Sequence, residues 1–235
     1  MLRPKYDIGW IGIDAGREGL WREPIWTDVL QIIANHNGER VYDASSPIYG
    51  ELESRHPKEA WRSQTADGKF RPLFRDYPNS WTRLGVISLA GQRFKITPLG
   101  QEILLGHKTK TSLLIDLFTT HEENSGPGNR DERPFIILAK AFLESPRPLS
   151  TDEIFWYVMK NYRPKNDSLQ IILRQKNKIS WPTPDATPYR RLRNMLSLMR
   201  AANAISSTRR GTGGTYWTPS DRNILTQLSL AFEND

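Results

Sequence analysis

The segment from Pro188 to Trp217 constrains the fold more than any other part of the chain. Its first half carries four apolar residues at steps of three and four: Leu192, Met195, Leu196 and Met199. This is the spacing of one helix face, and Pro188 suits the first turn, where its missing N–H costs nothing. The second half reads ISSTRR, a glycine-rich turn and TYWT, and glycine permits the positive φ that tight hairpin turns require. The segment therefore predicts a helix followed directly by a β-hairpin.

Charge indicates what this helix and hairpin contact. Residues 186–220 contain no Asp or Glu, and arginines occur in both halves of the segment: Arg190, Arg191, Arg193, Arg200, Arg209 and Arg210. A basic helix leading into a basic, glycine-tipped hairpin is the layout of the recognition helix and wing of a winged helix, and we interpret it as a DNA-contacting surface. The alternative is an ordinary helix and hairpin whose charges are simply solvated. Residues 79–105 have a similar arrangement of helix and hairpin, and this second occurrence favours DNA contact.

Composition narrows the class of protein. With 235 residues, 37% hydrophobic and 10% aromatic, the chain can build one large or two ordinary domains with real cores. The formal charge of +7 and the pI near 9.7 favour a polyanionic partner. Cysteine is absent, which excludes disulfides and thiolate metal sites, and no apolar run reaches membrane-spanning length. The start of the chain lacks a signal-peptide core, so we expect a soluble, cytoplasmic protein without a membrane partner.

The fold class that we expect is mainly α with small β-hairpins, arranged as tandem winged-helix domains. Four segments are predicted: an N-terminal arm over 1–23, a first winged-helix domain over 24–121, a linker over 122–132 and a second winged-helix domain over 133–235. The linker is polar and contains Gly and Pro. The arm either caps the first domain or contacts DNA through Arg17 and Arg22.

In the first domain, apolar spacing predicts a helix from Pro24 to Asn37-Gly38 and a second helix from Pro47. Val41-Tyr42 is a candidate short strand. Residues 57–76 mix helix-forming and helix-breaking types, so their boundaries are not predicted. Residues 79–105 predict a helix end, a two-stranded hairpin and a helix that starts at Pro98.

In the second domain, residues 134–144 predict an apolar helix, and Ser150 followed three residues later by Glu153 predicts a capping box at the start of the next helix. Residues 163–187 form an insertion with a short helical piece at 168–174. Its basic side chains either follow a phosphate backbone or belong to a solvated connector.

Two stretches carry longer motifs. SWTRLGVISLAGQRFKITPLGQEILLG has the order helix, LG-hydrophobic, wing and ITxxGxxLL, and RPFIILAKAFLESPRPLSTDEIFWYVM places a long apolar helix before an L-S-x-x-E-I helix. Both resemble the DNA-recognition modules of type IIS restriction endonucleases and related nicking enzymes, over roughly residues 81–162 and more loosely over the whole chain. The resemblance implies tandem winged-helix subdomains that read an asymmetric site, with cleavage by a separate C-terminal domain. No length remains after Phe232 for a nuclease domain, so we expect the recognition part of a restriction–modification enzyme.

No catalytic or metal site is predicted. Glu51 and Glu53 are the nearest candidates for a divalent-metal cluster, but no matching strand carries E-x-K, so we expect surface charges. The HPK tripeptide at 56–58 begins like a phospholipase-type nuclease signature, but Ser63 stands where an acid is required. Residues 211–214 lack the Lys-Ser/Thr of a phosphate-binding loop and fit a wing tip better. The histidines have no metal-ligand spacing: His36, His56, His107 and His121.

We therefore expect sequence-specific binding of double-stranded DNA. In the second domain the predicted DNA-binding residues are Tyr189, Arg190, Arg193 and Asn194 on the helix and Arg209, Arg210 and Thr212 on the wing. In the first domain they are Lys69, Arg71, Arg75, Asn79 and Arg83. Trp81 and Trp217 are expected in the core rather than stacked on bases.

No cofactor is expected in this chain, and Mg²⁺ only if a nuclease domain or subunit is attached. We expect no catalytic activity from the chain alone. Two alternatives remain open: a winged-helix transcriptional regulator, and a complete small nuclease whose active site the motifs do not show.

Overall fold

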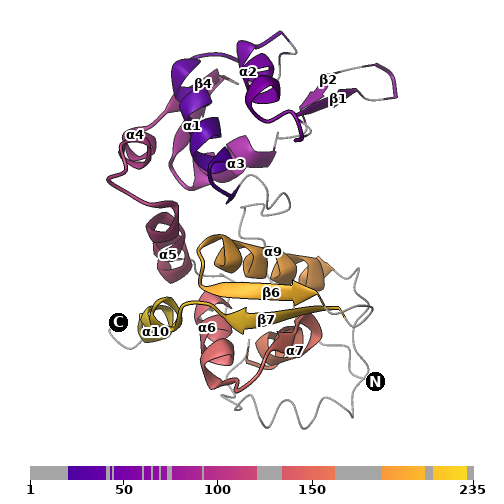
Figure 1. The fold of residues 1–235 in the computed structure, drawn as a ribbon, viewed down its shortest axis with the longest axis vertical. Coiled ribbons are helices and arrows are strands. Elements are labelled where there is room, and N and C mark those ends of the chain that lie inside the picture. The colour runs from indigo at the N-terminus through magenta and orange to yellow at the C-terminus, as the bar shows by residue number, and fades with distance from the viewer. Residues whose placement is uncertain are drawn as a thin grey trace, which may run out of the picture. The chain divides into compact units, whose positions relative to one another are not determined.

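The computed structural model describes residues 21–40, 43, 45–59, 61–64, 66–68, 70–72, 76–91, 93–120, 134–161, 187–209 and 214–231. In these ranges helices predominate, and each sheet is antiparallel with two or three strands (Figure 1). The predicted fold class, mainly helical with small hairpins, is confirmed. Most of the predicted arm, the predicted linker, the Val41-Tyr42 strand and the insertion before Thr187 lie outside the described residues. None of the described helices is long and apolar enough to cross a membrane.

The chain packs as two units that divide between Lys110 and Thr111. The elements of the N-terminal unit are α1 (Ile25–Asn35), α2 (Pro47–Arg55), β1 (Arg62–Gln64), β2 (Phe70–Pro72), α3 (Asp76–Arg83), β3 (Ile87–Ala90), β4 (Arg93–Ile96) and α4 (Pro98–Leu104). Helix α1 ends close to its predicted stop, where Gly38 has a φ of 95°. Its buried face is apolar: Trp26, Val29, Leu30, Ile32 and Ile33. Trp81 of α3 is fully buried and meets Trp26 edge-on at 5.6 Å, so its predicted place in the core is confirmed.

The hairpin β3–β4 and helix α4 form as the ITPLG motif predicts. Thr97 caps α4, because its Oγ1 accepts a hydrogen bond from the Gly100 amide at 3.1 Å and donates to the Val86 carbonyl at 2.8 Å. A Cβ added at Gly100 would collide with that carbonyl and lie 2.6 Å from the Ile96 side chain. The glycine is therefore needed for α4 to pack against the hairpin.

The C-terminal unit holds α5 (Lys110–Thr120) apart from its first residue, α6 (Pro134–Glu144), β5 (Leu149–Ser150), α7 (Thr151–Asn161), α9 (Thr187–Ala201), β6 (Ile205–Arg209), β7 (Thr215–Pro219) and α10 (Arg222–Leu230). Phe118 of α5 stacks on Phe135 of α6 at 4.2 Å. The packed units thus divide after the first residue of α5, whereas the sequence places a linker at 122–132.

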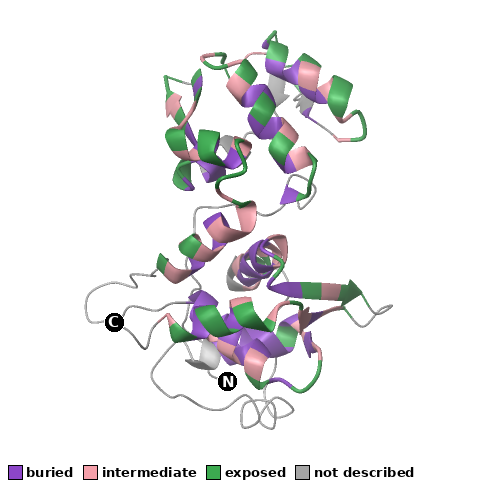
Figure 2. Ribbon diagram, turned by 60° about the vertical axis from the view of Figure 1, so that its left-hand side comes forward, coloured by how far each residue is buried: buried purple, intermediate pink, exposed green. Residues whose placement is uncertain are grey.

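The core of the C-terminal unit lies between its helices and a three-stranded sheet of order β5-β7-β6 (Figure 1). Helix α6 packs against α7 and α10, and α7 packs against β5, β7 and α9. Figure 2 shows the buried residues of each unit on the inward faces of its helices. The sheet is antiparallel, with Leu149 of β5 opposite Trp217 of β7 and Ile205 of β6 opposite Pro219.

The two units share one order of elements. Among the described elements, both units contain in turn a helix, a short extended segment, two more helices, a two-stranded hairpin and a last helix, and in the C-terminal unit α5 precedes this series. In each, the extended segment pairs with the second strand of the hairpin: Arg40 bridges to Arg93 of β4 in the N-terminal unit, and β5 pairs with β7 in the C-terminal unit. The N-terminal unit adds the hairpin β1–β2 between its second and third helices.

Candidate nucleic-acid interface

Helix α9 separates an apolar face from a basic one. Its fully buried side chains include the four predicted from spacing and one more: Leu192, Met195, Leu196, Leu198 and Met199. Arg190 and Arg193 are exposed, and Asn194 is half-buried. Residues three apart are neighbours on a helix surface, so the two exposed arginines point to the same side. The structure therefore brings together, on the side of α9 away from the core, two of the residues predicted to read bases.

The first turn of α9 is held by Tyr189. Its hydroxyl donates a hydrogen bond to Asp152 Oδ1 on α7 at 2.7 Å, and its ring lies 5.5 Å from that of Phe155. Burial, followed by the bond to Asp152, raises the pKa of Tyr189 to about 12. The hydroxyl is therefore a stable donor at neutral pH.

The last turn of α9 is held by Arg200. Its Nη1 donates to the hydroxyl of Ser207 on β6, and its guanidinium lies over the ring of Trp217 on β7. Burial lowers the pKa of Arg200. This basic residue is therefore committed to contacts within the unit, unlike Arg190 and Arg193.

The hairpin that follows α9 is anchored at its base. Trp217 is buried and its Nε1 donates to Thr151 Oγ1 at 2.9 Å, so its predicted place in the core is confirmed. Arg209 ends β6, opposite Thr215, and its side chain is exposed. The predicted wing residues Arg210 and Thr212 lie outside the described residues.

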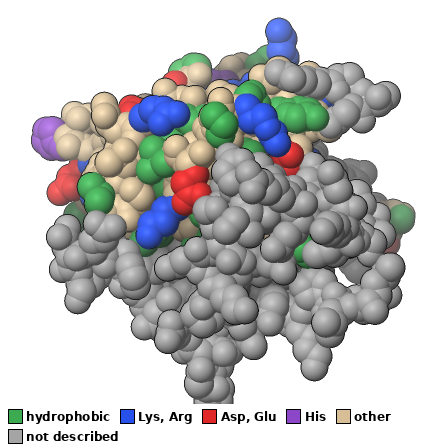
Figure 3. All heavy atoms as spheres, turned by 90° about the horizontal axis from the view of Figure 1, so that it is seen from below, with side chains coloured by type: hydrophobic (Ala, Val, Ile, Leu, Met, Phe, Trp, Pro, Cys, Tyr) green, Lys and Arg blue, Asp and Glu red, His purple; other side chains and the backbone are tan. Residues whose placement is uncertain are grey.

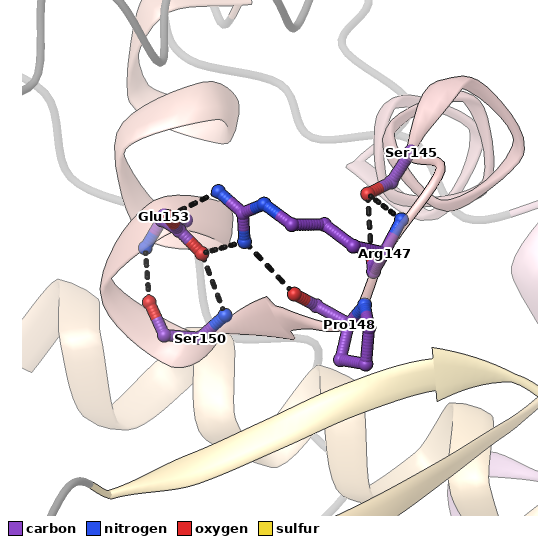
Figure 4. Close-up of polar contacts among 5 residues, drawn as sticks. All are labelled: Ser145, Arg147, Pro148, Ser150 and Glu153. Atoms are coloured by element: carbon purple, nitrogen blue, oxygen red, sulfur yellow. Dashed lines mark hydrogen bonds and ion pairs between the residues drawn. The ribbon is translucent and has the colours of Figure 1, made fainter.

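A capping box fixes the start of α7, next to the contact with Tyr189. The Ser150 hydroxyl accepts from the Glu153 amide at 3.2 Å, and Glu153 Oε2 accepts from the Ser150 amide at 2.9 Å, as the sequence predicts (Figure 4). Arg147 adds a bidentate pair to the same buried carboxylate at 2.9 and 3.1 Å, and also donates to the Pro148 carbonyl. The hydrogen bonds to Glu153 raise the pKa of Arg147. This network holds the loop before β5 and the first turn of α7 as one structure.

Fewer of the residues predicted to bind DNA are described in the N-terminal unit. Arg83 is the last residue of α3 and is exposed. Asn79 lies on α3 and Arg71 lies on β2, but the structure does not describe their side chains. Lys69 and Arg75 lie outside the described residues.

Sequence reasoning overlooked one exposed cation on the equivalent hairpin. Lys95 of β4 is exposed beside the buried Phe94, and the alternation in RFKIT contains that signal. Arg93 is exposed too, but its Nη1 donates to the Gly38 carbonyl at 2.7 Å. On the face of the molecule in Figure 3, the described Lys and Arg side chains form separate groups with acidic side chains near some of them.

Glu51, one of the two acidic residues weighed as a metal site, belongs to a network between α1 and α2. Glu51 accepts from His36 Nε2 at 2.7 Å and from Arg55 Nη2 at 2.6 Å, and the hydrogen bond from His36 lowers the pKa of Glu51. The Nε2 atom of His56 lies 3.0 Å from Oδ2 of Asp28, and the His56 ring lies near the ring of Trp61. Within the described ranges no group of three His, Asp or Glu side chains could hold a metal ion.

The fold built from these elements occurs in a known DNA-complexed domain. No protein-family model and no curated protein matches the sequence. Among solved structures, the chain is similar to the BpuJ1 endonuclease binding domain, seen in complex with pyrene- and phenanthrene-modified DNA. The two agree with a TM-score of 0.59 at 12% identity, over 97% of this chain and 87% of that chain. At this identity the likeness shows a shared helix-rich fold.

Proposed function

We propose that this chain binds double-stranded DNA at a specific sequence and is the target-recognition part of a restriction endonuclease. The observation that carries the proposal is the face of α9 with Arg190 and Arg193, which stands clear of the core and continues into the β6–β7 hairpin. Support comes from the fold shared with an endonuclease binding domain that was crystallised on DNA.

Each unit is proposed to be a winged helix. That fold has the order helix, strand, helix, helix and hairpin, with its first strand paired to its last. The pairing of β5 with β7 supports the proposal for the C-terminal unit. In the C-terminal unit α9 takes the position of the recognition helix and β6–β7 that of the wing. In the N-terminal unit α3 and β3–β4 take these positions.

The chemistry of the exposed residues suits reading of the major groove. An arginine can pair bidentately with guanine, and an asparagine with adenine, so Arg190, Arg193 and Asn194 are the proposed base readers. The wing residues Arg209, Arg210 and Thr212 are proposed to contact phosphates, which gives affinity but no sequence preference.

In the N-terminal unit Asn79 and Arg83 on α3 are the proposed counterparts of the base readers. Lys69, Arg71 and Arg75, in and beside β1–β2, are proposed phosphate contacts. Lys95 on β4 joins them, because its ammonium group is exposed on the strand that a wing would use.

Cleavage is assigned to a separate nuclease domain or subunit, which would supply the Mg²⁺ site. A transcriptional regulator is the second candidate, because the same fold can serve an operator. The two differ in symmetry: a regulator that binds as a two-fold dimer selects a palindrome, whereas a monomeric recognition module selects an asymmetric site.

Selection from a random duplex library tests this function. The protein is incubated with the pool, bound duplexes are enriched over several rounds, and the mass of the complex is measured by light scattering. We expect one asymmetric consensus bound by one chain. A palindromic consensus bound by two chains favours the regulator, and no enrichment contradicts sequence-specific binding.

A further inference from the structure

The contact between Tyr189 and Asp152 joins the first turns of two helices that are 37 residues apart in sequence. Tyr189 is the third residue of α9, and Asp152 lies in the first turn of α7. The Tyr189 ring also packs on Phe155, one turn further along α7. The start of α9 is therefore fixed to the helix beneath it by a directional bond and an aromatic contact.

This contact lies before the fully buried residues of α9. Among the side chains of α9 that the structure describes, the first fully buried one is Leu192. Arg190 comes before Leu192 in the sequence, and Arg193 comes directly after it. An arginine reads guanine through two parallel hydrogen bonds, which require a defined angle of approach. Small rotations of the first turn would misalign the guanidinium group of Arg190, which belongs to that turn.

We propose that the Tyr189–Asp152 hydrogen bond is a positioning contact that sets the sequence preference of α9 without touching a base. Tyr189 and Asp152 hold the first turn of α9 at one orientation, Arg190 reads bases from that turn, and Arg193 reads them from the next turn. The inference rests on the proposed function. It gives Tyr189 a role different from direct DNA contact, because its hydroxyl proton is already given to Asp152.

The positioning effect of Asp152 on sequence preference can be measured separately from the effect of its charge on DNA affinity. A carboxylate in the first turn of α7 interacts favourably with the helix dipole but repels phosphates. Replacing it with Ala removes the acceptor of the Tyr189 hydrogen bond and also one negative charge, and the loss of charge raises affinity for every duplex. The ratio of affinities for a selected and a random duplex cancels this general effect, so the ratio reports on positioning.

The test uses the full chain, the most enriched duplex from a random library and the random pool itself as probes. Tyr189→Phe removes the hydroxyl that donates, Asp152→Ala removes the carboxylate that accepts, and the double variant combines them. Glu102→Gln, at an exposed site on α4 of the other unit, is the matched control for loss of one negative charge. Thermal melts confirm that each variant is folded at the assay temperature.

We expect each single variant to lower the ratio of affinities by about fivefold, the equivalent of one hydrogen bond. The double variant should lose no more than either single one, because both remove the same contact. Glu102→Gln should leave the ratio unchanged.

Four results would overturn the positioning role. Wild-type ratios in both single variants show that the bond does not affect preference. A loss in Tyr189→Phe without one in Asp152→Ala, or additive losses in the double variant, show that the Tyr189 hydroxyl contacts DNA itself. A wild-type protein that enriches no sequence contradicts the proposed function, and the positioning role falls with it.

Discussion

The guanidinium of Arg200 lies over the indole ring of Trp217, 5.9 Å from the ring centroid. The two residues join the last turn of α9 to the central strand of the three-stranded sheet. Because Arg200 also donates to Ser207 on the edge strand β6, one side chain ties the helix to both strands of the hairpin. An arginine in the acid-free segment therefore serves the fold.

Replacing Arg200 with Met should lower the free energy of unfolding by about 1–2 kcal/mol, because the cation–π contact and the bond to Ser207 are lost while the aliphatic stem remains. Urea denaturation measures this change. The matched control is Arg193→Met, an exposed site on the same helix, which should change stability by less than about 0.5 kcal/mol. Equal stabilities for the two variants would show that the Arg200 contacts contribute nothing.

The same substitution should have opposite effects at two helical glycines. Gly100→Ala should destabilise the N-terminal unit by about 1–3 kcal/mol, because its Cβ collides with the Val86 carbonyl. Gly50→Ala, on α2, should stabilise it by about 0.5–1 kcal/mol, because nothing lies within 4 Å of the new methyl group and alanine favours helix. Melting temperatures of the two variants decide this. A stable Gly100→Ala protein would contradict the close packing of α4 on the hairpin.

Tyr189 should make stability depend on alkaline pH. Its pKa in the folded protein is about 12, above the ordinary value of 10.0, through burial first and the bond to Asp152 second. Because the pKa of Tyr189 is higher in the folded than in the unfolded protein, the neutral side chain stabilises the fold fully below pH 10.0. This contribution is lost as the pH rises toward about 12. The stability of the wild type should therefore fall more steeply over that range than that of Tyr189→Phe. Denaturation at successive pH values compares them, and parallel curves would argue against the raised pKa.

Base reading and phosphate contact should separate within the C-terminal unit. Arg193→Ala should cost about 1–3 kcal/mol on the selected duplex and relax the preference at one base position. Arg209→Ala should weaken binding to selected and random duplexes alike, and should make the salt dependence shallower by about one phosphate contact. Repeating the selection with each variant distinguishes them. An unchanged consensus for Arg193→Ala, with Arg190→Ala behaving likewise, would remove α9 from the role of recognition helix.

Local patterns in the sequence predicted the parts of the fold that depend on near neighbours. The capping box at Ser150 and Glu153 follows from two residues three apart, and the buried face of α9 follows from helical periodicity. The start of α4 at Pro98 is visible for the same reason, because Thr97 and Gly100 lie within one turn.

The parts that were missed depend on partners far away in the sequence. The strands β1 and β2 are three residues long and have no apolar alternation, so residues 57–76 gave no boundaries. The Tyr189–Asp152 bond and the Arg200–Trp217 contact join different elements, and only the fold brings them together. The charge of the segment therefore grouped Arg200 with Arg190 and Arg193, although their environments differ.

The most direct test of the account is a fluorescence-anisotropy titration of labelled duplex DNA with the wild-type protein at increasing salt. If basic side chains of both units neutralise phosphates, the logarithm of the association constant falls linearly with the logarithm of the salt concentration, with a slope of about −0.9 for each phosphate contacted. We predict a steep line for a random duplex, and tighter binding of the selected duplex at each salt concentration. No binding at low salt, or an affinity that does not change with salt, would contradict the assignment of this chain as a DNA-binding protein.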